Sequence, residues 1–424
     1  MTQRRAEPAT PAGVVLPYFT APDPHLTHDG GGRDPLGMQP VWSEIGRGLV
    51  PCLASPVAQV SGVRAVLLIH WIGALPALAA LQHSDKRRRG FLRLMEGILE
   101  YWLYQQQDSR HQVCFGGRSL QADNFTVEAS STKTVANGLH LYYRGSCRRA
   151  GFFDKDWNLD EALGRQFASL WPEAATAVLA PAIASGLAGR KVHVRALFND
   201  HPALPAALSC VFGDQGIHVR LRGLLGEEEK YHALARQFGA LRRTDKSPLH
   251  QRVQKLESAP LAHALEQMHN CEPFLLVMQD VFNLLLASGN VPLAQLAQDV
   301  GAFLEPMRQR ARNFLTLAGK LKTRRMRHMQ ELAQTLAAPG GIDAAGVAHA
   351  FIVHLLAYHE ACMEERGKEP LVLVEVERIV VASGGDADAA AARKRLLSGV
   401  PWDHDYYLNT AATIHQQLYS GEKP

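Results

Sequence analysis

The chain has 424 residues, of which 46% are apolar and 20% are charged. A chain of this length forms more than one domain, and its apolar fraction excludes an intrinsically disordered protein. The 45 basic and 41 acidic residues leave a net charge of +4, which excludes a strongly basic, histone-like protein. Composition therefore predicts a folded, multidomain protein and leaves its binding partners open.

The cysteines and the N-terminus bear on the compartment. Six cysteines stand far apart and none forms a CxxC pair, so the spacing indicates neither a zinc site nor a thioredoxin-like centre. The stretch Met1–Gly13 lacks the apolar core of a signal peptide. The longest apolar run, residues 65–81, is interrupted by Gly73 and Pro76 and falls short of a membrane span. We expect a cytoplasmic protein with reduced thiols, no membrane contact, and no cofactor or metal.

The first 160 residues predict two regions. Residues 1–40 are rich in Pro, Gly, Asp and His, which favours an extended arm. Residues 41–160 predict an N-terminal domain that begins with helical spacing and continues with glycine-punctuated, irregular segments. A second helix is predicted to follow the basic turn Lys86–Arg89, and Ser84 or Asp85 is placed to cap its start.

Residues 161–340 predict a middle domain, and residues 341–424 a C-terminal helix-strand-helix region. The alternating runs Val192–Leu197 and Ile217–Arg222 predict two short strands, each with one solvated face, followed by helices. A strand is also predicted over Leu371–Ala382, with valines on one face and Glu375 and Glu377 on the other.

These elements define the expected fold class. We predict a mainly α-helical, multidomain protein with a few short β-strands, an α+β arrangement. The chain contains neither GxxxxGK[ST] nor GxGxxG, so no P-loop or Rossmann domain is expected.

The charge is concentrated in one segment. Residues 306–330 contain eight basic residues and no acidic one, which leaves 37 basic against 41 acidic residues in the rest of the chain. One helix over residues 307–332 would place a row of basic side chains opposite an apolar face. Arginines on a rigid helix suit bidentate contacts with phosphates. The candidate nucleic-acid-binding residues are Arg308, Arg312, Lys320, Arg324 and Arg327.

Alternatives to nucleic-acid binding remain open for this segment. An ordinary exposed helix interleaves charges of both signs, whereas this segment does not. Three interpretations therefore remain. The segment binds DNA or RNA, it docks in an acidic groove of a partner protein, or it is a solvated helix face. The shorter cluster Arg87, Arg88 and Arg89 fits the same nucleic-acid partner.

No residue set predicts a catalytic site. His354 and His359 are five apart and so do not share a helix face, and Glu360 and Glu364 complete no known metal-ligand spacing. Glu375 and Glu377 on one strand face resemble part of a metal-dependent nuclease site, but a matching Asp and Lys are not identifiable.

The segment Trp402–Tyr407 is dense in aromatic and ionisable residues. It has an Asp/His pair but no adjacent serine or cysteine nucleophile. Aromatic residues of this kind anchor protein interfaces, so Trp402, Tyr406 and Tyr407 are predicted to bind a partner.

Two stretches resemble uncharacterised bacterial proteins encoded in antiphage defence islands. The first runs from Arg33–Gly37 through Trp42, Gly46-Arg47, Leu49–Pro51 and Arg64 to His70–Ile72; the second is Thr134–Asp154, with Asn137–Leu139, Tyr142–Gly145 and Arg148–Gly151. The resemblance covers about the first 160 residues. It implies a subunit of a multi-gene defence system that works beside a helicase, an ATPase or a nuclease, and it supplies no catalytic residues.

The leading hypothesis is a non-catalytic, nucleic-acid-associated subunit of a multi-protein antiviral defence complex. The enzymatic alternative is a metal-dependent nuclease. The second alternative is a purely structural adaptor that docks on an ATPase or helicase.

Overall fold

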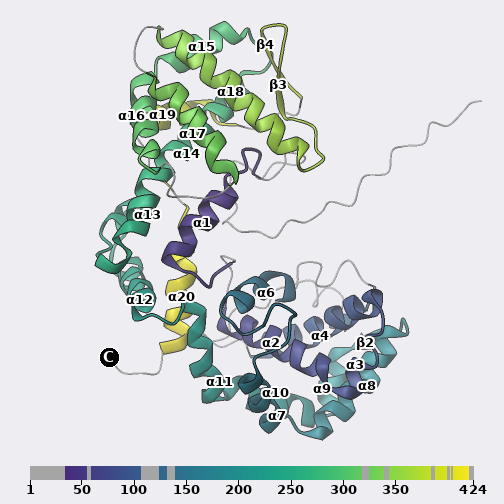
Figure 1. The fold of residues 1–424 in the computed structure, drawn as a ribbon. Helices are drawn as coiled ribbons and strands as arrows, with labels where there is room; N and C mark the ends of the chain where they lie inside the picture. Colours follow the sequence, from purple (N-terminus) through teal and green to yellow (C-terminus); the bar gives the residue numbers. More distant parts are fainter. Residues whose placement is uncertain are drawn as a thin grey trace, which may run out of the picture. The chain divides into compact units, whose positions relative to one another are not determined.

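The computed structural model describes residues 34–54, 59–106, 124–130, 139–317, 324–338, 343–382, 387–398, 402 and 404–419. These residues are mainly α-helical and contain two small two-stranded sheets, which confirms the predicted fold class (Figure 1). The chain divides into two compact units, each assembled from segments that are distant in sequence. Among the described residues, unit 1 comprises Ser61–Arg144 and Phe167–Phe212, and unit 2 comprises 34–60, Gly145–Gln166 and 213–419.

Unit 1 is built around the long helix α4 (Asp85–Gln105). Its other elements are α2 (Val60–Ala74), α3 (Pro76–Ala79), β1 (Thr126–Val127), the first half of α6 (Leu139–Arg149), the end of α7 (Glu161–Leu170), α8 (Glu173–Leu187), β2 (Val192–His193), α9 (Val194–Asp200) and α10 (Ala203–Gly213). Helices α8 and α9 and strand β1 pack against α4. The apolar residues of α4 therefore form the centre of this unit.

Helix α4 begins where the sequence predicts. Ser84 is the N-cap, and its hydroxyl accepts a hydrogen bond of 3.3 Å from the Arg87 backbone N–H. Further along the helix, Gly97 permits close packing of β1, since a Cβ at this position would come within 2.5 Å of Val127 Cγ2.

The strands predicted in the middle of the chain are largely wrong. Of the run Val192–Leu197, only Val192 and His193 form a strand, and α9 begins at Val194. The run Ile217–Arg222 lies in α11 (Gln215–Arg220) and the 3₁₀ turn η2 (Leu221–Leu225). Asp214 explains the second error, because its carboxylate accepts a 2.7 Å hydrogen bond from the Ile217 N–H and caps α11.

Unit 2 contains most of the remaining helices. In chain order they are α1 (Gln39–Leu49), α12 (Glu229–Thr244), α13 (Leu249–Gln254), η3 (Ala259–Leu261), α14 (Ala262–Ser288), α15 (Leu293–Gly301), α16 (Leu304–Leu315), α17 (Arg324–Ala337), α18 (Ala344–Glu364), α19 (Ala389–Ser398) and α20 (Leu408–Tyr419). Helix α14 is mostly buried and packs against α1, α16 and α19.

One helical stretch, Ala259–Ser288, is long and apolar enough to cross a membrane by length and composition. Its apolar window is 72% buried inside the protein, as in the core helix of a soluble protein. The α7–α8 pair passes the same test only if helices bent by 98° are counted as one broken span. These features are weak evidence for a membrane and are consistent with a soluble protein.

The predicted strand Leu371–Ala382 is a hairpin. Strand β3 (Val372–Glu375) pairs antiparallel with β4 (Arg378–Val381) through a turn at Val376 and Glu377. Both turn residues have positive φ, at 47° and 59°. The turn is not predictable from the sequence because its two residues are not Asn or Gly, which favour positive φ.

The arm predicted for residues 1–40 does not include the last part of this range, since residues 34–40 pack in unit 2. Residues 1–33 lie outside the described part of the chain, whereas Leu36 and Met38 are buried in unit 2. The Asp34 carboxylate accepts a 2.7 Å hydrogen bond from the Met38 N–H, and Arg366 forms an ion pair with it at 3.3 Å. Burial raises the pKa of Asp34 to about 6 in spite of these contacts.

Candidate functional site

The single basic helix predicted over residues 307–332 is wrong. Helix α16 ends at Leu315, α17 begins at Arg324, and the two helices pack against each other. Lys320 lies outside the described residues, as does the rest of 318–323. Because the helix is interrupted, the predicted residues do not form one continuous row.

Several arginines of this segment hold helices together. Arg308 Nε donates to the Leu336 carbonyl at 3.1 Å and so links α16 to α17. Arg310 is buried and donates to the carbonyls of Arg395 and Leu396 at 3.2 and 3.0 Å. Arg325 forms a 2.6 Å ion pair with Glu365. The absence of acidic residues within the segment reflects, in part, partners that lie elsewhere in the sequence.

Two predicted nucleic-acid contacts of this segment face solvent. Arg312 on α16 and Arg327 on α17 are both exposed. Arg324 is the first residue of α17. Among the residues that the structure describes, the exposed Arg312 and Arg327 therefore lie on two different helices and not on one.

The aromatic residues predicted to bind a partner are buried in unit 2. Trp402 and Tyr407 are 5% and 3% exposed, and Tyr406 is fully buried. The Tyr406 hydroxyl donates to the carboxylate of Glu272, which also accepts from Trp42. These side chains form part of the protein core, so the prediction that they present an exposed anchor is wrong.

The basic cluster of α4 lies on the surface of unit 1. Arg88 and Arg89 are exposed and Arg87 is half-buried. Arg88 forms an exposed ion pair with Asp85 at 3.1 Å, a contact that contributes little to stability. The cluster is accessible to a ligand because Asp85, the ion-pair partner of Arg88, is also exposed to solvent.

Two histidines meet beside this cluster, and sequence reasoning did not single them out. His70 Nε2 of α2 lies 3.1 Å from His140 Nδ1 of α6, with the rings stacked 5.0 Å apart between centroids. Burial lowers the pKa of His70 to about 4, and the charge of Arg88 contributes to this shift. Burial also lowers the pKa of His140 to about 3, with contributions from His70, Arg144 and Arg88.

These pKa values define the chemistry of the histidine pair. At neutral pH both rings are uncharged, and their mutual hydrogen bond requires one ring nitrogen to donate and the other to accept. Two cationic side chains, Arg88 and Arg144, act on the pair, and both are exposed. We call His70, Arg88, His140 and Arg144 the histidine–arginine site.

A buried carboxylate supports the position of His140. Glu96 of α4 accepts a 2.6 Å hydrogen bond from the His140 backbone N–H, in the first turn of α6. Burial raises the pKa of Glu96 to about 7, and burial together with the charge of Glu96 holds the pKa of Glu100 well above its usual value. These two acids therefore add little negative charge below pH 7. The site keeps its positive character there.

The residues considered for a metal-dependent nuclease do not converge. Glu375 lies opposite Arg378 in the hairpin, and Glu377 in the turn lies 3.7 Å from His349. His354 bonds to Thr335, while both ring nitrogens of His359 are occupied by the Pro35 carbonyl and the Leu371 N–H. Over the described ranges, no group of three or more His, Cys, Asp or Glu side chains is arranged to hold a metal ion.

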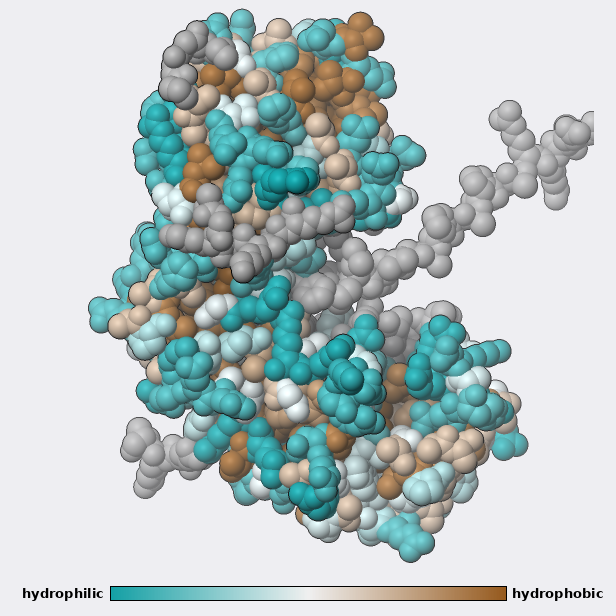
Figure 2. Space-filling model, in the orientation of Figure 1, coloured by the Kyte–Doolittle hydropathy of each residue, from teal (hydrophilic) through white to brown (hydrophobic). Residues whose placement is uncertain are grey.

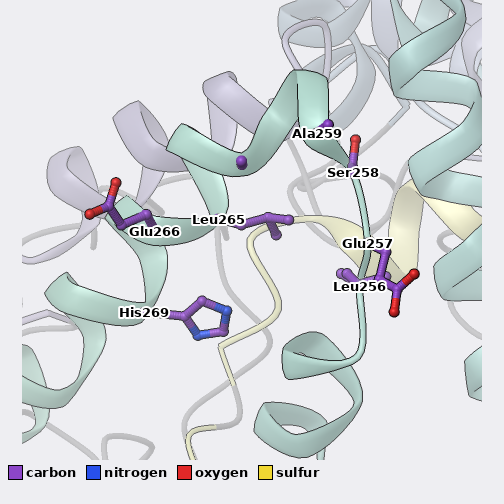
Figure 3. Close-up of a pocket in the computed structure, with 8 residues that line it drawn as sticks. Leu256, Glu257, Ser258, Ala259, Leu265, Glu266 and His269 are labelled. Atoms are coloured by element: carbon purple, nitrogen blue, oxygen red, sulfur yellow. The ribbon is translucent and has the colours of Figure 1, made fainter.

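A surface pocket of unit 2 is lined by residues 256–258, by η3 and by the first two turns of α14. It has a volume of about 530 Å³, and four of its eight lining residues are apolar. Figure 3 shows the His269 ring and the Leu265 side chain directed toward the loop that carries Leu256, whereas Glu266 points the other way. This pocket contains none of the predicted site residues.

Comparison of the chain with protein-family models, with curated proteins and with solved structures finds no match.

Proposed function

We propose that this chain is a nucleic-acid-binding subunit of a bacterial antiviral defence complex and that the histidine–arginine site of unit 1 contacts the phosphate backbone. The observation that carries the proposal is the convergence of α2, α4 and α6 on two neutral imidazoles and two exposed guanidiniums. Guanidinium groups bind phosphates through paired N–H donors, and a neutral imidazole contributes a further N–H donor.

The immediate surroundings extend the same charge. Arg87 and Arg89 lie on the turn of α4 that carries Arg88. A cationic surface of this kind binds a phosphate backbone without reading its sequence. The defence role, the cytoplasmic location and the action beside a helicase, ATPase or nuclease are supported by the resemblance of the first 160 residues.

Salt-dependent binding to labelled oligonucleotides tests the proposal. We expect the full chain to bind oligonucleotides of about 30 nucleotides, both single strands and duplexes, with an affinity that falls steeply as salt concentration rises. The double variant Arg88→Glu/Arg144→Glu should lose at least about tenfold in affinity and show a shallower salt slope.

A charge-matched control belongs to the same unit. Arg190 and Lys191 are exposed and follow α8, so Arg190→Glu/Lys191→Glu changes the net charge equally. This control should bind almost as the natural chain does. Equal losses in both double variants would show a general charge effect, and the assignment to the histidine–arginine site would then be wrong.

A further inference from the structure

Exposed apolar side chains gather on one part of unit 2. Val353 of α18, Val374 of β3 and Val376 at the hairpin tip are 38%, 39% and 94% exposed. Figure 2 shows hydrophobic atoms over the hairpin and the adjoining length of α18. Contiguous exposed apolar surface on a soluble protein marks an interaction site more often than scattered single residues do.

The outer edge of β4 is already covered. Ile379 N–H donates to the Val291 carbonyl at 2.9 Å, and Val381 N–H donates to the Asn290 side chain at 3.3 Å. The register Glu375↔Arg378 turns the backbone groups of these two β4 residues away from β3. A segment of unit 2 thus occupies this side of the hairpin.

The outer edge of β3 is open at Val374. The same register turns the N–H and C=O groups of Val372 and Val374 away from β4. Val372 is buried, whereas Val374 is exposed, and within the described ranges no hydrogen bond reaches the Val374 backbone groups. An exposed strand edge with free donors and acceptors is a template for another strand.

The hairpin tip carries a second unusual feature. Val376 has a φ of 47°, a conformation that β-branched residues avoid and that Asn or Gly adopts readily. A strained valine with 94% exposure gains nothing from burial in unit 2. Local strain that folding does not require is commonly retained for a function.

The charge around this edge is negative. Residues 360–378 contain six acidic and three basic residues; of the basic ones, Arg366 is engaged by Asp34 and Arg378 donates to the Asn290 carbonyl. The acidic side chains that are exposed here, apart from Glu365 in its ion pair with Arg325, are Glu360, Glu364, Glu369, Glu375 and Glu377. The surface therefore complements an apolar segment that carries positive charge.

We propose that the outer edge of β3 binds an extended, positively charged segment of a partner protein by strand addition. The Val374 N–H and C=O groups pair with the incoming backbone, and Val376 contacts its apolar side chains. The flanking carboxylates select lysine or arginine at alternating positions. This surface is independent of the histidine–arginine site and of the proposed nucleic-acid contact.

A synthetic peptide is the direct probe. We expect labelled Lys-Val-Lys-Val-Lys-Val-Lys to bind the full chain in a fluorescence-anisotropy titration, and a Glu-Val-Glu-Val-Glu-Val-Glu peptide to bind at least about tenfold more weakly. Added salt should weaken the first interaction. Equal affinity for the two peptides, or binding of neither, would overturn the proposal.

Variants locate the interaction. Val376→Gly relieves the positive φ and removes the apolar tip, so it should raise the melting temperature while it weakens peptide binding at least about fivefold. Val374→Pro removes the outward N–H without removing a β3–β4 hydrogen bond and should also weaken binding. Val219→Ala, at an exposed valine of α11, serves as the control and should leave binding unchanged.

Two outcomes decide against this assignment. Unchanged peptide affinity in Val376→Gly and Val374→Pro would show that the peptide binds elsewhere. Sedimentation that reveals a dimer of the natural chain and a monomer of Val376→Gly would identify the occupant as a second copy. Nucleic-acid affinity should be the same in the natural chain and in Val376→Gly, which separates this test from that of the proposed function.

Discussion

The indole Nε1 of Trp42 donates a 2.8 Å hydrogen bond to Glu272, a residue 230 positions later in the chain. Glu272 is 1% exposed and also accepts from the Tyr406 hydroxyl, so one carboxylate joins α1, α14 and the segment before α20. Trp42 is further stacked on His404, with ring centroids 4.4 Å apart. This polar cluster fixes three distant segments of unit 2 in one arrangement.

Glu272 makes the stability of the chain depend on pH. Burial raises its pKa to about 7, which means that the folded state holds the proton more tightly than the unfolded state does. The stabilising contribution is therefore complete below pH about 4.5 and is lost as pH rises through 7. We expect Glu272→Gln to be more stable than the natural chain at pH 8, by on the order of 1–3 kcal/mol, and nearly equal to it at about pH 5.

Urea unfolding at the two pH values measures this difference. Glu96 and Asp34 also have raised pKa values, so the natural pH dependence should shrink in Glu272→Gln and not disappear. An identical pH dependence in the two proteins would contradict the role assigned to Glu272.

The contrast between Arg310 and Arg312 tests whether the basic segment is partly structural. Arg310 is 8% exposed and donates to two backbone carbonyls at the end of α19, whereas Arg312 is exposed. Arg310→Met should lower the free energy of unfolding by about 2–4 kcal/mol, because it leaves buried carbonyls without their donor. Arg312→Met should change it by less than about 0.5 kcal/mol. Thermal or urea unfolding of both variants checks the contrast, and equal effects would refute it.

Close packing at Gly97 predicts a severe effect from a small substitution. A methyl group there would press against Val127, so Gly97→Ala should cost about 1–3 kcal/mol despite the better helix propensity of alanine. Gly213, at the end of α10, provides the matched control, because a Cβ added there would meet no atom within 4 Å. Gly213→Ala should be neutral within about 0.5 kcal/mol in a chemical-denaturation experiment.

The two histidines should not make nucleic-acid binding depend on pH near neutrality. His70 and His140 have pKa values of about 4 and 3, so neither ring gains a proton between about pH 8 and 6. Glu96, whose pKa is about 7, does lose its negative charge as pH falls through this range. We therefore expect Glu96→Gln, which cannot titrate, to bind a labelled single strand with a dissociation constant that changes less than about twofold between pH 8 and 6 at constant salt. A rise in affinity of about tenfold or more at the acidic end in this variant would mean that the bound histidines are charged.

Local signals predicted parts of the fold well. Ser84 caps α4 as its side-chain chemistry indicates. The alternating run Ile217–Arg222 was misleading because Asp214, three residues before Ile217, supplies a helix cap that outweighs the strand pattern. In the hairpin, a turn built from Val376 and Glu377 carries no local sequence signal.

The histidine–arginine site depends on contacts between residues that are distant in the sequence, and local sequence patterns do not predict such contacts. His70 and His140 are brought together only by the packing of α2 and α6, and their contact joins residues 70 positions apart. The arginines between residues 306 and 330 were predicted as one surface because their partners, such as Glu365 and the Leu396 carbonyl, lie on other helices. Burial of Tyr406 likewise follows from its long-range bond to Glu272.

The interleaving of the two units also determines the order in which they can be completed during synthesis. All described parts of unit 1 have been made once Phe212 is added, whereas unit 2 still lacks Gln417, whose side chain accepts a 2.9 Å hydrogen bond from Val60 N–H across 357 residues. At a synthesis rate of roughly 5–20 residues per second, on the order of 10–50 s pass between the synthesis of α1 and the addition of Glu272. Unit 1 can therefore fold first during synthesis, while the early segments of unit 2 depend on segments as late as the one that carries Gln417.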